Sequence, residues 1–396
     1  MIGPLSLRRF RASARRDHGE RMESRSSPPG SPEGSHPPNH PSSGLAASLQ
    51  LPPRPPFLSV ILIASLHRDY VQESLASIAS QSLDPTVREL IVLCDYEDPE
   101  FHEKVRTIGG RVVRVAPGPF GPKIAAALGQ ARGEVLCFLE DDDRFTPNKL
   151  EEVDRAFRSD PELVFLRNSY SVIDGTGRTR PNHPFRAAER AAAHRLGSRV
   201  FLPGPGLEFL REMPPIGLAF NSSCMSIRKE VLGRFLSVVN IANLRVLDHL
   251  LFFAALAARQ SLRVEARPLT EYRVHARNIS MGGGTAGDLV SQRAAWSRLV
   301  LPSYETLLQA AISLKDPALV REAEGLLEVQ RAYALLREGG RSAAALRAAR
   351  RSVRGRRDTY AVRSEPQLPY ALALFAWFPW LGRSIYRGKI RALATE

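Results

Sequence analysis

Short apolar segments that alternate with helical patterns constrain the fold of this chain more than any other feature of its sequence. The apolar segments are rich in Val, Ile and Leu on both faces, which is typical of strands buried inside a parallel sheet. We predict strands at residues 58–64, 89–94, 111–116 and 134–139, and helices at residues 70–80 and 122–130. The alternation predicts an α/β fold with a doubly wound, Rossmann-like sheet, whose ligands bind beyond the carboxyl ends of the strands.

Four acidic residues, Glu140-Asp141-Asp142-Asp143, follow the fourth predicted strand. A run of acids is most often a solvated loop. Here a buried strand delivers the run to the ligand-binding edge of the sheet, where clustered carboxylates repel one another unless a cation neutralises them. Carboxylate oxygens beside a diphosphate suit Mg²⁺ or Mn²⁺. The acidic run therefore predicts a site for a metal ion and a diphosphate.

The composition indicates a globular protein with a large core: 43% of the 396 residues are hydrophobic and 24% are charged. These values exclude collagen, a coiled coil and a wholly disordered chain. Three cysteines, Cys94, Cys137 and Cys224, lie in apolar stretches and are too few for a disulfide framework. We therefore expect a cytoplasmic protein.

The net charge of +14 is concentrated at the two ends of the chain. Residues 1–55 hold eight arginines against four acids, and residues 341–396 hold twelve basic residues against three acids, so the middle is nearly neutral. This distribution argues against a nucleic-acid groove and favours an anionic partner for the ends, such as a membrane surface. Residues 1–55, rich in Pro and Ser, are predicted to be disordered, and they contain no apolar run typical of a secretory signal.

Several segments, in their order along the chain, resemble the family 2 glycosyltransferases of the GT-A fold from about Leu58 to Ser280. The most specific is Phe138-Leu139 with the acidic run, which is similar to the family's Phe-Leu-Asp-x-Asp-Asp segment. The other similar segments are residues 63–68, 121–133, 221–228, 247–253 and 272–280. The resemblance implies a GT-A type mixed sheet and a metal-dependent enzyme. This enzyme would move a sugar from a nucleotide-diphosphate sugar to an acceptor hydroxyl, with inversion, in glycan or polysaccharide biosynthesis.

The resemblance also implies roles for individual residues. Asp142, with Glu140, would bind Mg²⁺ or Mn²⁺, and Asp248 would be the catalytic base that takes the proton of the acceptor hydroxyl. The implied donor-binding residues are Ser65, Arg68, Asp95, Lys123, Glu140, Asp141 and His275. Glu140 stands where the family has Asp, and Leu66, His67 and Leu247 also depart from the family pattern, so the nucleotide stays open.

Each of these residues also has an ordinary structural interpretation. Asp248 fits the first turn of a helix, where a carboxylate meets unpaired backbone N–H groups, and Asp95 fits a polar turn. Lys123 and Arg68 fit solvated surface charges, and His275 fits a structural hydrogen-bond donor. The sequence leaves both interpretations open.

The part of the chain beyond the resemblance is predicted to be helical. Residues 319–337 and 342–352 have helical periodicity, and the apolar residues 368–381 lie between arginine-rich flanks. The last segment fits either an anionic membrane surface, on the cytoplasmic face, or packing against the protein itself or a second copy. We therefore expect a disordered tail (1–55), a GT-A domain (56–286), a helical appendage (287–360) and an apolar, basic segment (361–396).

Two other functions remain as alternatives to a glycosyltransferase that uses a glycan or lipid-linked acceptor. A non-catalytic nucleotide- or glycan-binding protein could have the same fold. A nucleotidyltransferase also uses a divalent metal, but it usually has a Gly- and Lys/Arg-rich loop after its first strand, and residues 64–68 contain no glycine.

Overall fold

The structure is a computed structural model of the chain. It describes residues 56–65, 69–183, 189–190, 197–213, 220–275, 278, 286–337, 342–363, 367–378 and 380. The predicted tail at residues 1–55 and the residues Leu66, His67 and Arg68 lie outside the described residues.

The described strands form one mixed sheet in the order β3-β2-β1-β4-β8-β6-β9-β5, with β7 paired to β9. The parallel half contains β1 (Leu58–Ala64), β2 (Arg88–Cys94), β3 (Gly110–Arg114) and β4 (Val135–Glu140). The mixed half contains β5 (Arg144–Phe145), β6 (Leu163–Asp174), β7 (Arg199–Phe201), β8 (Met225–Arg228) and β9 (Ser261–Val274). The four strands predicted from the sequence are the four strands of the parallel half.

Helices cover both faces of the sheet. In β1, Val60 and Leu62 pack in a core with the first helices, whereas Ile61 and Ile63 pack in a second core with later helices. The first core uses α1 (Val71–Ala79), α2 (Pro99–Thr107) and α4 (Lys149–Ser159). The second uses α3 (Phe120–Gln130), α6 (Lys229–Leu236) and α7 (Leu247–Ala258). Alternate residues of a strand point to opposite faces, so the fully apolar β1 has a core on each side.

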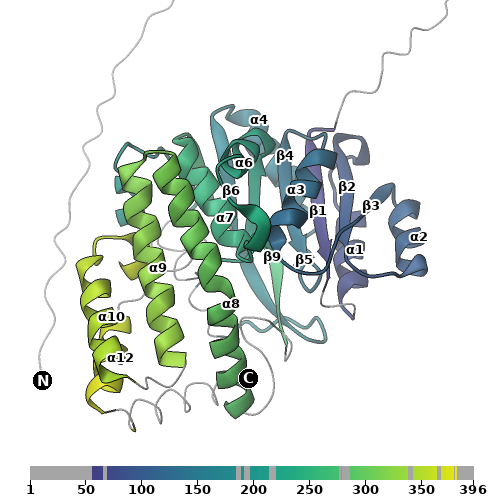
Figure 1. Cartoon of the computed structure of the whole chain (residues 1–396). Helices are drawn as coiled ribbons and strands as arrows, with labels where there is room; N and C mark the ends of the chain where they lie inside the picture. Colours follow the sequence, from purple (N-terminus) through teal and green to yellow (C-terminus); the bar gives the residue numbers. More distant parts are fainter. Residues whose placement is uncertain are drawn as a thin grey trace, which may run out of the picture. The chain divides into compact units, whose positions relative to one another are not determined.

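The described helices that follow β9 are α8 (Ala286–Ser313), α9 (Pro317–Arg337), α10 (Ala343–Gly355), α11 (Tyr360–Arg363) and α12 (Leu368–Trp377). Of these, α8, α9 and α11 contribute residues to the second core of the sheet. Figure 1 shows α8 and α9 lying side by side, and Leu307 of α8 and Leu319 of α9 belong to the same core as Ile61. A further core joins α9, α10 and α12. Among the helices that are described, none combines the length and the apolar character that crossing a bilayer requires.

A buried carboxylate ties the amino ends of the parallel strands together. Glu89 of β2 accepts hydrogen bonds from Ser59 Oγ (2.6 Å) and from the backbone N–H of Arg132 (2.6 Å). Arg111 lies 2.8 Å from the same carboxylate. Gly133 is required beside them, because a Cβ there would lie 2.6 Å from the backbone nitrogen of Ser59. This junction fixes the start of β4 next to β1.

Glu89→Gln is expected to lower the free energy of unfolding by about 2–3 kcal/mol at pH 7. Burial alone would raise the pKa of Glu89, but the hydrogen bonds from Ser59 and Arg132 and the charge of Arg111 lower it to about 2. Because the folded pKa is depressed, this stabilisation is present above the unfolded pKa of roughly 4.3 and is lost as pH falls toward 2. Denaturant unfolding at pH 7 and at lower pH measures it.

The exposed Glu100, which pairs with Lys104 along α2, provides the matched control. Glu100→Gln is expected to cost less than about 0.5 kcal/mol, since surface ion pairs contribute little. An equal loss in the two variants, or a loss for Glu89→Gln that does not shrink as the pH falls, would contradict the assigned role of Glu89.

Candidate functional site

The candidate residues meet where β1, β2 and β4 end. These strands are parallel, and Ala64 pairs with Cys94 while Ile63 pairs with Glu140. From β1 the chain winds through β2 to β3 on one side, and β4 then joins on the other side of β1. The gap between the ends of β1 and β4 is therefore the topological switch point, where open α/β sheets bind their ligands.

Four predicted donor-binding residues form one hydrogen-bonded cluster at this switch point. The backbone N–H of Ser65 donates to Asp141 Oδ2 (2.7 Å), and the Ser65 hydroxyl donates to the Asp95 carboxylate. Lys123 of α3 donates to Ser65 Oγ (2.8 Å) and to Asp95 Oδ2 (2.7 Å). The Lys123 side chain is only 3% exposed, so the prediction of a solvated surface charge is wrong for this lysine. Arg68 lies outside the described residues.

Glu140 and Asp142 are carboxyl groups whose ionised forms are disfavoured by burial and by neighbouring acids. Burial and the carboxylates of Asp142 and Asp143 raise the pKa of Glu140 well above its ordinary range. Burial and the neighbouring Asp143 and Asp141 do the same for Asp142. The Ser222 hydroxyl donates to Glu140 Oε1 (2.5 Å). A cation bound beside them would favour the ionised forms of both groups.

The turn that holds Glu140 is supported from the core. The 3₁₀ turn η3 (Ser222–Cys224) provides Ser222 and also Ser223, whose hydroxyl accepts the backbone N–H of Glu140 (3.0 Å). The carbonyl of Ser223 accepts hydrogen bonds from the ammonium of Lys149 and from Thr270 Oγ1 (3.0 Å). Burial lowers the pKa of Lys149 to about 8. This buried network places Glu140 at the edge of the sheet.

The carboxylate of Asp143 accepts hydrogen bonds from within the protein. It accepts the backbone N–H of Arg273 (2.9 Å) and the side-chain amide of Asn221 (2.8 Å). Asn221 has a φ of 61°, a backbone conformation that asparagine tolerates better than most residues. The buried Arg273 also donates from Nε to the carbonyl of Asp142 (2.7 Å). Asp143 and Arg273 therefore hold the shape of the acidic run.

His275 lies beside Asp142. Its Nε2 is 3.2 Å from Asp142 Oδ2, and Asn278 Nδ2 donates to the same oxygen at 3.2 Å. Burial and the charge of Arg273 lower the pKa of His275 to about 4. The imidazole is therefore neutral near pH 7, and it can donate one hydrogen bond toward a carboxylate or a phosphate.

A cavity of about 250 Å³ brings Glu140, Asp142 and Asp248 together. The three come from β4, the loop after it, and α7. Aromatic side chains form much of the remaining wall: Phe120, Phe220, Tyr272, Trp296 and Tyr304. The cavity thus combines carboxylates at one end of the parallel sheet with apolar surfaces that fit the faces of a ring.

Asp248 occupies the first turn of α7, as the structural interpretation predicted. Its Oδ1 accepts the backbone N–H of His249 (2.8 Å), and His249 Nδ1 lies 3.1 Å away. The side chain is nevertheless 26% exposed and lines the cavity. The Asp248 carboxylate therefore both bonds to the first turn of α7 and faces the cavity.

The residues of the acidic run fit a divalent cation. Glu140 and Asp142 offer hard oxygen ligands in one cavity, and Mg²⁺ usually takes one or two carboxylates together with substrate phosphates and water. Within the described part of the chain, no cluster of three or more His, Cys, Asp or Glu side chains is arranged to hold a metal ion.

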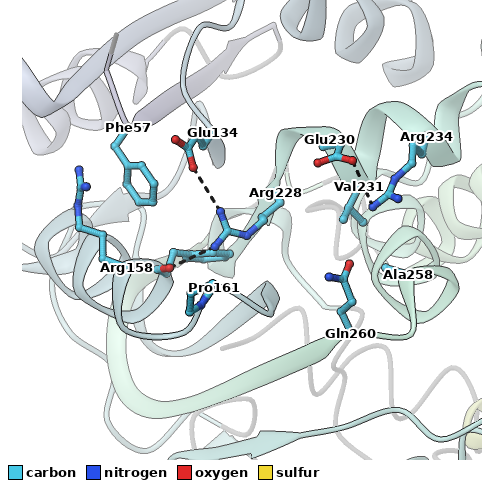
Figure 2. A pocket seen from close by; sticks show the side chains of 11 residues that line it. Phe57, Glu134, Arg158, Pro161, Arg228, Glu230, Val231, Arg234, Ala258 and Gln260 are labelled. Carbon is cyan, nitrogen blue, oxygen red and sulfur yellow. Dashed lines mark hydrogen bonds and ion pairs between the residues drawn. The ribbon is translucent and has the colours of Figure 1, made fainter. Parts of the chain in front are cut away.

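A larger hollow, of about 840 Å³, lies at the opposite end of the sheet (Figure 2). It is lined by Phe57, before the start of β1, and by Arg228, at the end of the antiparallel β8. Figure 2 shows Arg228 bonded to Glu134. The Arg228 guanidinium also donates to the backbone carbonyl of Phe157 (3.2 Å). None of the predicted site residues lines this hollow. Its three arginines, Arg158, Arg228 and Arg234, are each paired with an acid of the protein.

Several residues of the cavity escaped the sequence analysis. Trp296 and Tyr304 come from α8, in the region predicted only as a helical appendage. Asn278 follows the predicted His275 by three residues and contacts Asp142, but no spacing rule marks it. Helical periodicity describes which residues are apolar, and it does not show which of them face a distant cavity.

Comparison with known proteins identifies the class of this domain. Residues 59–235 match the family model described as Glycosyl transferase family 2. The match confirms the resemblance to the family 2 glycosyltransferases that was predicted from the sequence. A search of curated proteins found no match to the chain.

Solved structures similar to this chain include S. aureus TarS and a mannosyltransferase. S. aureus TarS 1-349 is 16% identical with a TM-score of 0.46, over 85% of this chain and 90% of that one. The same TarS fragment in complex with UDP-GlcNAc is 17% identical with a TM-score of 0.41, over 78% and 90%. The mannosyltransferase PcManGT from Pyrobaculum calidifontis, in complex with GDP-Man and Mn²⁺, is 16% identical with a TM-score of 0.43, over 86% of each chain. The predicted α/β fold class, a mixed sheet followed by helices, is confirmed by the strand order and the element order of the structure itself.

Proposed function

We propose that this protein is a metal-dependent, inverting glycosyltransferase that moves a sugar from a nucleotide-diphosphate sugar to an acceptor hydroxyl in glycan or polysaccharide biosynthesis. The observation that carries the proposal is the cavity shared by Glu140, Asp142 and Asp248. A reaction of this kind needs negative charge to be stabilised on one side of the sugar and a base on the other. We assign the catalytic domain to residues 56–286 and the helical region to residues 287–360.

The nucleotide part of the donor is proposed to bind at the ends of β1 and β2. The polar atoms there come from Ser65, Asp95 and Lys123, which are joined to one another in the structure. Asp141 is joined to this cluster because it accepts the backbone N–H of Ser65. Arg68, which follows Ser65 by three residues in the sequence, is proposed to bind the donor with them. The proposed role of His275 is to donate a hydrogen bond near the diphosphate.

Glu140 and Asp142 would hold the Mg²⁺ or Mn²⁺ ion. When bound, such an ion supplies positive charge to the diphosphate as it leaves. The protein contributes the placement of the two carboxylates. Ser222 and Ser223 fix Glu140, and Asn278 fixes Asp142, so neither side chain has to be ordered at the moment of reaction.

Asp248 is proposed to accept the proton of the acceptor hydroxyl. A hydroxyl has a pKa far above 7, so it attacks well only when a base takes its proton in the same step. A single displacement of this kind inverts the anomeric centre. Trp296 and Tyr304 of α8 line the same cavity, and their rings suit a glycan or the saccharide part of a lipid-linked acceptor.

A donor screen tests the proposal. UDP-, GDP-, dTDP- and CDP-sugars are incubated with the full chain and Mn²⁺ or Mg²⁺, and released nucleotide is measured. We expect one nucleotide to be released and expect EDTA to reduce the rate at least about a hundredfold, with recovery when Mn²⁺ is restored in excess. The anomeric configuration of the product, read by NMR, tests inversion.

The alternatives give different results in the same screen. A binding protein would bind a nucleotide in calorimetry and release none from any sugar donor. A nucleotidyltransferase would release diphosphate from a nucleoside triphosphate in the presence of a sugar phosphate. Turnover that EDTA leaves unchanged would overturn the assignment of Glu140 and Asp142 to a metal ion.

A further inference from the structure

The exposed aromatic side chains gather in one short stretch at the end of the described chain. Tyr370, Trp377, Phe378 and Trp380 are 70%, 64%, 55% and 71% exposed. Among the described residues, every other large hydrophobic side chain of comparable exposure is aliphatic. We name these four residues the aromatic surface. Single exposed apolar residues are common, but four large aromatic ones within eleven positions indicate an interaction site.

The helix beneath the aromatic surface is well packed. Leu368, Leu372 and Phe375 of α12 are buried in the core shared with α9 and α10. The sequence left open whether the aromatic residues of this segment pack on the protein, and the structure answers this residue by residue. Phe375 is buried against the protein, whereas Trp377, Phe378 and Trp380 are exposed. The aromatic surface is thus held in place by a folded support.

A row of arginines lies on α10, which packs against α12. Arg347, Arg351 and Arg354 of α10 are exposed, and their spacing places them on one side of the helix. The sequence of α10, AAALRAARRSVRG, contains no acid, and no ion pair is recorded for these three arginines within the described residues. The Arg347 guanidinium lies 5.7 Å from the centre of the Trp377 ring. Figure 1 shows α10 and α12 lying together, and the contact between Arg347 and Trp377 joins the arginine row to the aromatic surface.

We propose that this face binds an anionic lipid bilayer, with the aromatic rings among the headgroups and the arginines on lipid phosphates. Trp and Tyr partition to the level of the headgroups because one end of the ring is apolar and the other is polar. Arginine adds about 1 kcal/mol of attraction per residue near an anionic surface. The binding is peripheral and reversible, and it is independent of the proposed sugar transfer.

Charge favours a bilayer over a second copy of the chain as the occupant. A symmetric dimer through this face would bring the same patch of each copy together, including both arginine rows. Like charges held close would oppose such a contact. An anionic bilayer offers an apolar interior boundary for the aromatic rings and negatively charged headgroups for the three arginines.

Flotation of the full-length protein with vesicles tests the proposal. One set of vesicles is phosphatidylcholine alone, and the other contains roughly 30 mol% phosphatidylglycerol. The aromatic variant replaces Trp377 and Trp380 with Ala. The charge variant replaces Arg347, Arg351 and Arg354 with Gln. The control is Leu202→Ala, since Leu202 is 75% exposed and lies after β7, outside this face.

We expect wild type and Leu202→Ala to float with the anionic vesicles and to be released by salt. The aromatic variant should bind at least about tenfold more weakly. The charge variant should bind roughly a hundredfold more weakly to anionic vesicles. Thermal melting checks that each variant is folded, and donor turnover in lipid-free buffer should be equal in all of them, so a failure here is distinct from a failure of the proposed function.

Three results would overturn the proposal. The first is wild-type protein that does not float with anionic vesicles, and the second is folded variants that float as wild type does. The third is a dimer, seen by light scattering without lipid, that the aromatic variant converts to a monomer. That outcome would assign the face to contact between copies.

Discussion

Asp142→Asn is expected to reduce sugar transfer by about a thousandfold. Asp142 lies in the cavity with Glu140, and its backbone and side chain are held by Arg273 and Asn278. An amide of the same shape keeps this packing but removes the negative charge that a divalent ion needs. The rate of nucleotide release in the presence of Mn²⁺, with the donor identified by the screen, measures the loss.

The same substitution is expected to leave the protein folded. Burial and the adjacent acids already disfavour the charged form of Asp142, so an uncharged amide relieves repulsion. We therefore expect the melting temperature of Asp142→Asn to stay level or to rise. The control is Asp358→Asn, a 52% exposed acid of the helical region, which should keep full activity. Wild-type turnover by Asp142→Asn would refute its role, and an unfolded variant would refute the account of its burial.

The parallel half of the sheet could be predicted from the sequence because each strand is a short, continuous apolar run. In β1 and β4 the apolar residues face a core on both sides, so the local pattern reflects the environment directly. α2 was missed, since Asp98 and Pro99 resemble a polar turn. They are instead the cap and first residue of the helix, with Asp98 accepting the N–H of Phe101 (2.9 Å).

The candidate site was predictable where function depends on consecutive residues, and less so where it depends on distant partners. The acidic run marks its own position after β4. Lys123, by contrast, could be assigned either to phosphate or to solvent from sequence. Its partner Asp95 is 28 residues away, and only the fold shows that the two side chains meet in a buried pair.

The aromatic walls of the cavity illustrate the same limit. Trp296 and Tyr304 lie on α8, after the residues that match the family model. Tyr304 is 5% exposed and packs with its ring edge to His249. From the sequence, the helical pattern predicts only that such residues are buried. The structure shows that they line the same cavity as Asp248.

Asp248→Asn separates the two interpretations of Asp248 that the sequence left open. If Asp248 is the base, the amide cannot take a proton, and kcat for sugar transfer is expected to fall about a thousandfold. If Asp248 only starts α7, the amide oxygen can still accept the N–H of His249, as Oδ1 does at 2.8 Å, and activity should persist. Initial rates with saturating donor and acceptor measure the difference.

Asp248→Ala completes the comparison. It removes both the base and the hydrogen bond at the helix start, so we expect the same loss of transfer together with a loss of about 0.5–1 kcal/mol in stability. Donor binding, measured by calorimetry with Mn²⁺, should remain in both variants because the nucleotide-side cluster of Ser65, Asp95 and Lys123 does not involve Asp248. A folded Asp248→Asn protein that binds donor and transfers sugar at the wild-type rate would show that the carboxylate acts through the helix alone. If Asp248→Asn instead loses transfer while its stability and donor binding are unchanged, Asp248 is the proton acceptor. In that variant the hydrogen bond at the helix start is kept, and only the basic carboxylate is lost.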